Sequence, residues 1–246
     1  MPAKEQKQIK ARKWHQKWWG IILLIILALA IIIVASFIYL VVFYVEIKMQ
    51  QDWQQVLTSP NLKSQNIIDQ RIMIESSDDP FWGKADASLV IVEFSDFQCP
   101  FSAQAYQIIK SIRQQYADQI KIIYRDMPDI NNHNLALDAA IAANCAHEQD
   151  KFWQYHDQLF ENQANLSVAR FETIAISLGL DQEQFTKCLS ERKYEAEVKD
   201  DLASGIGFGV NATPTFFING NKVPGVIQYS TFIQIINKIE ELDLLK

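Results

Sequence analysis

Residues 89–102 read LVIVEFSDFQCPFS, an apolar run followed by a short polar turn and a Cys-Pro pair. The run 89–94 is almost continuous in branched apolar residues and is interrupted only by Glu93, which is typical of a strand covered by helices on both faces of a sheet. Pro100 suits the first turn of a helix, because the backbone N–H that proline lacks has no partner there. The stretch therefore predicts a buried strand that leads directly into a helix, with Cys99 at the helix N-terminus.

Cys99 lies where a helix favours an anion. The unpaired backbone N–H groups and the positive end of the helix dipole stabilise negative charge at an N-terminus, so the thiolate form of this cysteine should be favoured. A free cysteine is otherwise among the most buried residue types and packs as a small apolar side chain. The position at a strand-to-helix junction favours the reactive interpretation over the buried one.

The rest of the chain adds strands and helices around this stretch. Asn219-Gly220 separates two short β-rich runs and is a type I′ turn signal, while Asp181 and Gln184 form a capping-box pattern. Together these elements predict the α/β class, with a helical insertion between two halves of a sheet. The predicted elements are strands at 72–74 and 120–124, helices within about 130–205, a hairpin at 213–223 and a final helix at 230–242.

An uncharged apolar run of 26 residues, Gly20 to Val45, precedes the α/β part. As a helix it would be about 39 Å long at ~1.5 Å per residue, against a hydrocarbon core of roughly 30 Å. A cleaved signal peptide has a shorter apolar region followed by a small-residue site, whereas Ala28-Leu29-Ala30 lies inside this run. The sequence therefore predicts one uncleaved transmembrane helix at residues 20–45.

Charge around the apolar run predicts its orientation. Six of the 23 lysines and arginines precede Gly20, but only one of the 29 acids does; the positive-inside rule places such a segment in the cytoplasm. The remainder has a net charge of −11, which argues against nucleic acid as a partner. The apolar run makes the lipid bilayer an expected partner. We expect a single-pass protein of the cytoplasmic or inner membrane. Its parts are a basic cytoplasmic tail at 1–19, a transmembrane helix at 20–45, an extracytoplasmic stalk at 46–77 and a folded domain at 78–246.

Four motifs occur in order along the folded part. They are EFSDFQCPF at 93–101, AANCA at 142–146, FW at 152–153 and TPTFF at 213–217. In this order, with a helical insertion between the sheet halves, they resemble the DsbA-like branch of the thioredoxin superfamily from about Asp79 to the C-terminus. The resemblance implies a thioredoxin fold with an inserted helical subdomain and a thiol-disulfide oxidoreductase. We expect no cofactor and no metal site, because His133, His147 and His156 lack tight metal-ligand spacing.

The resemblance assigns roles to individual residues. It implies that Cys99 is the exposed nucleophile and that a cis peptide bond before Pro214 forms a loop beside it, where substrate can pair. Glu93 matches the buried acid beneath the active site of this family; burial raises the pKa of such a carboxyl, which could then exchange a proton with Cys99. A structural carboxyl with a hidden partner is the alternative for Glu93. The supporting residues are Pro100, Phe101, Thr213 and Pro214.

Ser102 departs from the family pattern, because oxidases of the family carry a second cysteine there and store a Cys-X-X-Cys disulfide. Cys99 can still form a mixed disulfide, but no neighbouring thiol can expel it. Ser102 can only offer a hydrogen bond near the sulfur, or it simply sits in the first helical turn. A substrate thiol, a small thiol, a membrane-embedded redox partner, or Cys145 or Cys188 after a rearrangement would resolve the mixed disulfide. The sequence predicts disulfide shuffling, reduction or mixed-disulfide formation on exported polypeptides. A redox-degenerate polypeptide-binding or scaffold module is the alternative.

Cys145 and Cys188 each lie on an apolar face of a predicted helix, so both sulfurs can point into the helical insertion. A disulfide persists outside the cytoplasm. We therefore expect these two cysteines to form a structural disulfide that leaves Cys99 free. A bond from Cys99 to either of the others is the rival pairing, and it would abolish the proposed chemistry.

Overall fold

The computed structural model divides the chain into two units, one before and one after residue 59. The first contains helix α1 (Trp18–Thr58), whose segment Trp18–Val45 is long and apolar enough to cross a membrane and is not buried inside the protein. Because α1 continues to Thr58, the first part of the predicted stalk is helical. The structure describes residues 18–58, 74–76 and 79–241, so most of the predicted tail and the rest of the stalk lie outside the described residues.

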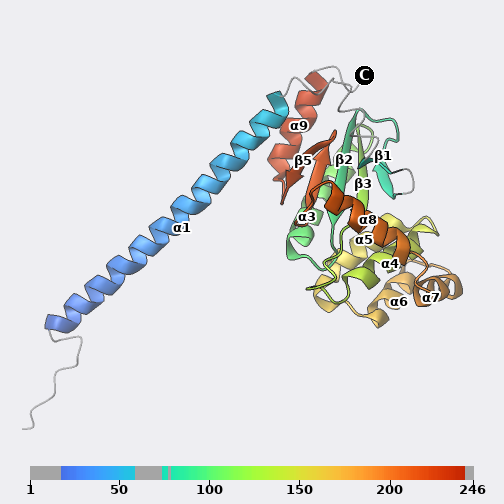
Figure 1. Ribbon diagram of the computed structural model, residues 1–246, viewed down its shortest axis with the longest axis horizontal. Coiled ribbons are helices and arrows are strands. Elements are labelled where there is room, and N and C mark those ends of the chain that lie inside the picture. Colours follow the sequence, from blue (N-terminus) through green and yellow to red (C-terminus); the bar gives the residue numbers. More distant parts are fainter. Residues whose placement is uncertain (1–17, 59–73, 77–78, 242–246) are drawn as a thin grey trace, which may run out of the picture. The chain divides into compact units, whose positions relative to one another are not determined.

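The second unit is built on a five-stranded mixed sheet of order β1-β3-β2-β4-β5 (Figure 1). β2 and β3 pair in parallel, and the other three pairings are antiparallel. β2 is buried at every position, as its apolar composition predicts. The strands are β1 (Phe81–Gly83), β2 (Leu89–Ser95), β3 (Ile120–Asp126), β4 (Thr215–Ile218) and β5 (Asn221–Pro224).

Five helices, α4 to α8, lie between β3 and β4 in the described part of the chain. Figure 1 shows α4, α6 and α7 grouped at one end of the sheet. The prediction of an α/β unit interrupted by helices is therefore confirmed. The helices of this unit are α3 (Pro100–Tyr116), α4 (Ala136–His147), α5 (Phe152–Glu161), α6 (Val168–Ser177), α7 (Gln182–Ser190), α8 (Glu195–Gly207) and α9 (Tyr229–Glu241), with a 3-10 turn η3 at Gln163–Asn165.

Both faces of the sheet bury apolar side chains, and one of them also buries an acid. One face is apolar, and its packed residues include Val90, Val92, Phe94, Ile123, Val210 and Phe217. Glu93 alternates to the opposite face of β2, where Tyr124 of β3 and Phe216 of β4 are its partners in register. Tyr124 contacts Phe152 of α5 there. The central strand thus carries one acid into the layer between the sheet and the helices.

The first described strand of the domain is not where the sequence predicts one. Of the predicted strand 72–74 only Ile74 lies among the described residues, and it is not in a strand; β1 pairs with β3 instead. Gly83, the last residue of β1, has a positive φ of 94°. A Cβ at Gly83 would lie 2.1 Å from the carbonyl oxygen of Ile120. Glycine is needed here because the backbones pass too closely for a side chain.

Asp181 is the N-cap of α7, and its carboxylate accepts a hydrogen bond from the backbone N of Gln184 at 2.9 Å. Asp181→Ala removes this acceptor, so we expect the free energy of unfolding to fall by about 1 kcal/mol in urea denaturation. Asp181→Asn keeps an acceptor and should stay within about 0.5 kcal/mol of the parent. Equal losses in the two variants would contradict the capping role.

Candidate active site

Cys99 occupies the N-cap position of α3, and Pro100 is the first helical residue. The predicted junction between a buried strand and a helix is therefore confirmed. The carbonyl oxygen of Cys99 accepts a hydrogen bond from the backbone N of Ala103 at 3.1 Å, which begins the helix. The Cys99 side chain makes no capping bond, so the sulfur is turned elsewhere.

The Cys99 sulfur faces the proline loop. Its thiol donates to the carbonyl oxygen of Thr213, with 3.2 Å between Sγ and oxygen, although the two residues are 114 apart in sequence. The Thr213–Pro214 peptide bond is cis. Pairing of β2 with β4 brings the two segments together, because Phe94 and Thr215 are in register. Residues from before and after the helical insertion thus meet at the sulfur.

Cys99 is less accessible than the resemblance implies. Only 6% of this residue is exposed, because its sulfur lies against the proline loop. The expectation of an exposed nucleophile is therefore wrong for this structure. Phe101 is 62% exposed, so solvent meets an apolar ring beside the site. Cys145 and Cys188 form a disulfide, and Cys99 is the free cysteine.

Ser102 lies in the first turn of α3 and is fully buried. Its hydroxyl accepts a hydrogen bond from the backbone N of Asp96 at 3.4 Å. This contact supports the turn between β2 and α3. Among the described residues, Ser102 has no hydrogen bond to the Cys99 sulfur, so the structure assigns its hydroxyl to the backbone.

Asp96 organises the turn that precedes Cys99. Its Oδ1 accepts from the backbone N of Gln98 at 2.7 Å, and its Oδ2 accepts from the backbone N of Asp129 at 2.8 Å. His133 Nδ1 lies 2.7 Å from the same Oδ2. The Asp96 side chain is completely buried. Sequence analysis assigned Asp96 no role; the available signal was its position directly after the carboxyl end of a parallel strand, where α/β sheets place their sites.

Two glutamines attach the same turn to the helical insertion. Gln98 Oε1 accepts from the backbone N of Leu135, the N-cap of α4, at 2.6 Å. Gln163, in η3, donates through Nε2 to the carbonyl oxygens of Phe97 and Cys99, at 2.9 Å each. Sequence reasoning missed Gln163, because no local pattern distinguishes it from the other glutamines of the chain.

Glu93 is buried, with 2% exposed. Burial raises the pKa of its carboxyl to about 7, and the Ser95 hydroxyl and the positive charge of Arg113 only partly oppose this effect. Its Oε1 has no hydrogen-bond partner within the described ranges. Near neutral pH the carboxyl is therefore present in both protonation states and can accept or release a proton.

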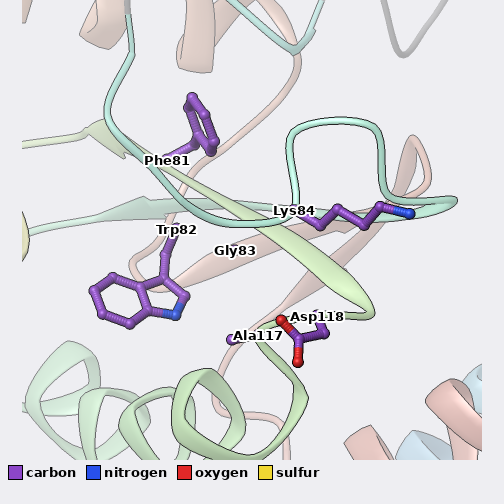
Figure 2. A pocket seen from close by; sticks show the side chains of 6 residues that line it. All are labelled: Phe81, Trp82, Gly83, Lys84, Ala117 and Asp118. Atoms are coloured by element: carbon purple, nitrogen blue, oxygen red, sulfur yellow. The ribbon is translucent and has the colours of Figure 1, made fainter.

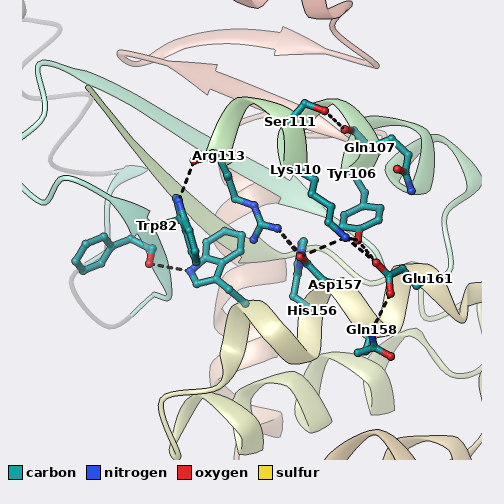
Figure 3. A network of polar contacts seen from close by, with 12 residues as sticks. Trp82, Tyr106, Gln107, Lys110, Ser111, Arg113, His156, Asp157, Gln158 and Glu161 are labelled. Carbon is teal, nitrogen blue, oxygen red and sulfur yellow. Dashed lines mark hydrogen bonds and ion pairs between the residues drawn. The ribbon is translucent and has the colours of Figure 1, made fainter. Parts of the chain in front are cut away.

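A polar network joins α3 to α5 (Figure 3). Arg113 Nη2 lies 2.5 Å from Asp157 Oδ1, and Lys110 Nζ lies 2.7 Å from Glu161 Oε1. His156, next to Asp157, is buried among aromatic rings, and burial lowers its pKa to about 4. The histidine is thus neutral at physiological pH and packs as a structural residue. The network holds the insertion against the helix that begins at Cys99.

A hollow of about 650 Å³ lies beside β1 (Figure 2). It is lined by Phe81, Trp82, Gly83, Lys84, Ala117 and Asp118. None of the predicted site residues lines it. The thiol and this hollow therefore belong to different places in the fold.

A family model described as thioredoxin matches residues 75–238. The Na⁺/H⁺ antiporter NhaA 1 of Mycolicibacterium vanbaalenii is 33% identical over 165 residues, which is 66% of this chain and 27% of the relative. NhaA 3 of Salinispora tropica is 32% identical over 162 residues, which is 66% of this chain and 25% of that relative. The chain thus spans about a quarter of the length of these relatives.

Several solved structures share the fold. The thiol-disulfide exchange protein alpha-DsbA2 from Wolbachia pipientis superposes with a TM-score of 0.64 at 21% identity, covering 71% of this chain and 94% of that one. BdbD from Bacillus subtilis superposes with a TM-score of 0.59 at 23% identity, covering 65% of this chain and 91% of that one. DsbA2 from Pseudomonas aeruginosa gives 0.56 at 23% identity, with coverage of 70% and 99%. The predicted thioredoxin fold with an inserted helical subdomain is thereby confirmed.

Proposed function

Because the chain belongs to the thioredoxin family, as the match over residues 75–238 shows, we propose that it is a membrane-anchored thiol-disulfide oxidoreductase acting through Cys99 alone. Its substrates are exported polypeptides that carry thiols or disulfides. The observation that carries the proposal is the placement of the free thiol at the N-terminus of α3, 3.2 Å from the Thr213 carbonyl oxygen. The chain spans only about a quarter of the length of the Na⁺/H⁺ antiporters that it matches, so the match does not support antiport by this chain.

The proposed reaction is thiol-disulfide exchange. Cys99 loses its proton and attacks one sulfur of a substrate disulfide; a bond forms between the two sulfurs, the substrate disulfide breaks, and the departing thiolate takes up a proton. Glu93 supplies a proton acceptor within the fold, since its pKa of about 7 lies near working pH. Ser102 cannot store a disulfide with Cys99, so a second substrate thiol or a small thiol attacks the mixed disulfide and releases Cys99.

The residues around Cys99 support this reaction in different ways. Pro100 begins α3 and places Cys99 at the N-terminus of that helix. Phe101 offers an exposed apolar contact for substrate. The Thr213-Pro214 loop lies against the sulfur, where an extended polypeptide would place its own sulfur.

We place the domain outside the cytoplasm. The segment Trp18–Val45 can cross a membrane, and the basic residues before it favour a cytoplasmic N-terminus. The disulfide between Cys145 and Cys188 suits an oxidising compartment. Protease treatment of intact spheroplasts should digest the domain, whereas an inward-facing domain would be protected.

Glutathione disulfide tests the reaction directly. The folded parent protein is expected to gain one glutathione per chain, located at Cys99 by peptide mass mapping, and Cys99→Ser should gain none. Ser102→Cys should form an intramolecular disulfide with Cys99 and shorten the lifetime of the mixed disulfide by about tenfold or more, because an adjacent thiol resolves it without diffusion.

An adduct that forms in urea but not in the folded parent would overturn the proposal. It would favour a second candidate, a polypeptide-binding or scaffold module without redox activity. The specific observation behind this candidate is the 6% exposure of Cys99. Such a module would bind unfolded polypeptides equally well after Cys99→Ser.

A further inference from the structure

Gln163 contacts the backbone that carries the nucleophile, although it belongs to the helical insertion. Its Nε2 donates both to the carbonyl oxygen of Phe97 and to that of Cys99, each at 2.9 Å. These residues are 66 and 64 positions away in sequence. One amide group thus spans the turn on both sides of Gln98.

The two carbonyl groups depend on Gln163 to different degrees. The Cys99 oxygen also accepts from the backbone N of Ala103, whereas Gln163 supplies the hydrogen bond to the Phe97 oxygen among the described residues. Phe97 is buried, with 1% exposed, so its carbonyl has little access to water. Loss of the amide would leave a buried acceptor unpaired and would free the turn to move.

The position of Gln163 is itself held by α3. Glu161, two residues earlier, accepts hydrogen bonds from Lys110 Nζ at 2.7 Å and from the Tyr106 hydroxyl at 2.9 Å. Figure 3 shows these side chains converging between the two helices. Gln163 therefore connects Cys99, the N-cap of α3, to a segment whose Glu161 already bonds to Tyr106 and Lys110 of the same helix.

Electrostatics gives this contact a chemical consequence. The Phe97 and Cys99 carbonyl groups belong to the turn that carries the sulfur, and the negative end of a carbonyl dipole disfavours a thiolate near it. The partial positive charge of the Gln163 amide hydrogens offsets both dipoles. A carboxylate in the same place would do the reverse, since it accepts hydrogen bonds and adds negative charge.

We propose that Gln163 is a positioning residue for Cys99, which holds the turn 97–99 and favours the thiolate by donating to both of its carbonyl oxygens. The part that the thiolate plays in disulfide exchange rests on the proposed function. The effect of Gln163 on the thiol does not, because alkylation of Cys99 tests it without a substrate. It makes the helical insertion part of the active centre.

The test measures the rate of Cys99 alkylation by iodoacetamide from pH 4 to pH 9 in the full chain in detergent. Gln163→Glu is expected to raise the pH midpoint of alkylation by about one unit and to slow the reaction at pH 7 by about tenfold. Gln163→Met keeps the size and loses the donor, so it should slow the reaction by about threefold or more with a smaller shift.

Gln154→Met is the matched control. Gln154 is an exposed residue of α5, so its variant makes the same substitution in the insertion without touching the turn or Glu161 and should alkylate like the parent. The midpoints of urea denaturation show whether each variant is folded. If Gln163→Glu does not fold, the test relies on Gln163→Met. Parent-like pH profiles in both Gln163 variants would overturn the inference. A parent that alkylates but never exchanges with glutathione disulfide would instead overturn the proposed function.

Discussion

Removing the Cys145–Cys188 disulfide by Cys145→Ala together with Cys188→Ala is expected to lower the free energy of unfolding by about 4 kcal/mol. The bond joins α4 to α7 across a sequence separation of 43 residues. A cross-link restricts the unfolded chain more strongly the longer the loop that it closes, which is why the expected loss is large. Urea denaturation of the parent and the double variant measures the difference.

Replacing both cysteines by alanine also removes two sulfur atoms from the protein interior. The parent protein with its disulfide reduced is the control for this loss of volume, because it keeps both sulfur atoms. Both residues are buried, so part of the loss in the alanine variant comes from imperfect packing. The reduced parent should nevertheless lose most of the same free energy. A loss below about 1 kcal/mol in both samples would contradict a stabilising disulfide.

The same double variant bears on function, because Cys99 is then the one cysteine of the chain. Under the proposed function a thiol from outside resolves the mixed disulfide at Cys99. Its lifetime in the presence of glutathione should therefore match that of the parent. A much longer lifetime in the variant would mean that the chain's own cysteines take part in resolution.

Replacing Glu93 by glutamine is expected to make the protein more stable than the parent at pH 8, by up to about 3 kcal/mol, and to leave stability near pH 4 unchanged. Burial raises the pKa of this carboxyl from 4.5 to about 7 in the folded protein. The folded state therefore binds the proton more tightly than the unfolded chain does. The resulting stability is fully present below pH 4.5 and is lost as the pH rises to about 7.

Urea denaturation at pH 4, 6 and 8 checks the prediction for Glu93→Gln. The difference between variant and parent should grow steadily over this range, since glutamine remains neutral at every pH. Asp86→Asn is a control, because the Asp86 side chain is 82% exposed, and it should follow the parent at all three values. A constant difference between Glu93→Gln and the parent would show that the carboxyl does not titrate near neutrality.

Glu93→Gln should also slow disulfide exchange at pH 7, because it removes the proposed acceptor for the thiol proton. The rate of adduct formation with glutathione disulfide measures this effect. Raising the pH should recover the rate, since hydroxide can then remove the proton from Cys99. An unchanged rate at pH 7 would leave Glu93 with a structural role only.

Local sequence was enough to predict most elements of the folded unit. The apolar run before Asp96 became a fully buried strand, and Pro100 began the next helix. The Asn219-Gly220 pair has the two positive φ angles, 45° and 83°, that its turn signal requires. Such predictions succeed because each depends on residues only a few positions apart.

The centre itself depends on contacts that no local pattern reveals. Gln163 reaches the Cys99 carbonyl across 64 residues, and His133 reaches Asp96 across 37. Each contact exists because pairing of the strands and docking of the insertion bring distant segments together. The same reason explains the error over Phe81–Gly83, whose strand forms only because β3 lies alongside it.

Sequence alone therefore supplied the two features on which the proposed exchange through a single thiol rests, a cysteine at a helix start and a serine in place of a second cysteine. Packing set how that sulfur is presented. Its burial to 6% exposure, its contact with the Thr213 carbonyl oxygen and the Gln163 amide on its turn depend on segments distant in sequence, Gln163 within the insertion and Thr213 after it. Burial and hydrogen bonding depend on distances in space, and these follow from the whole fold rather than from neighbouring residues in the chain.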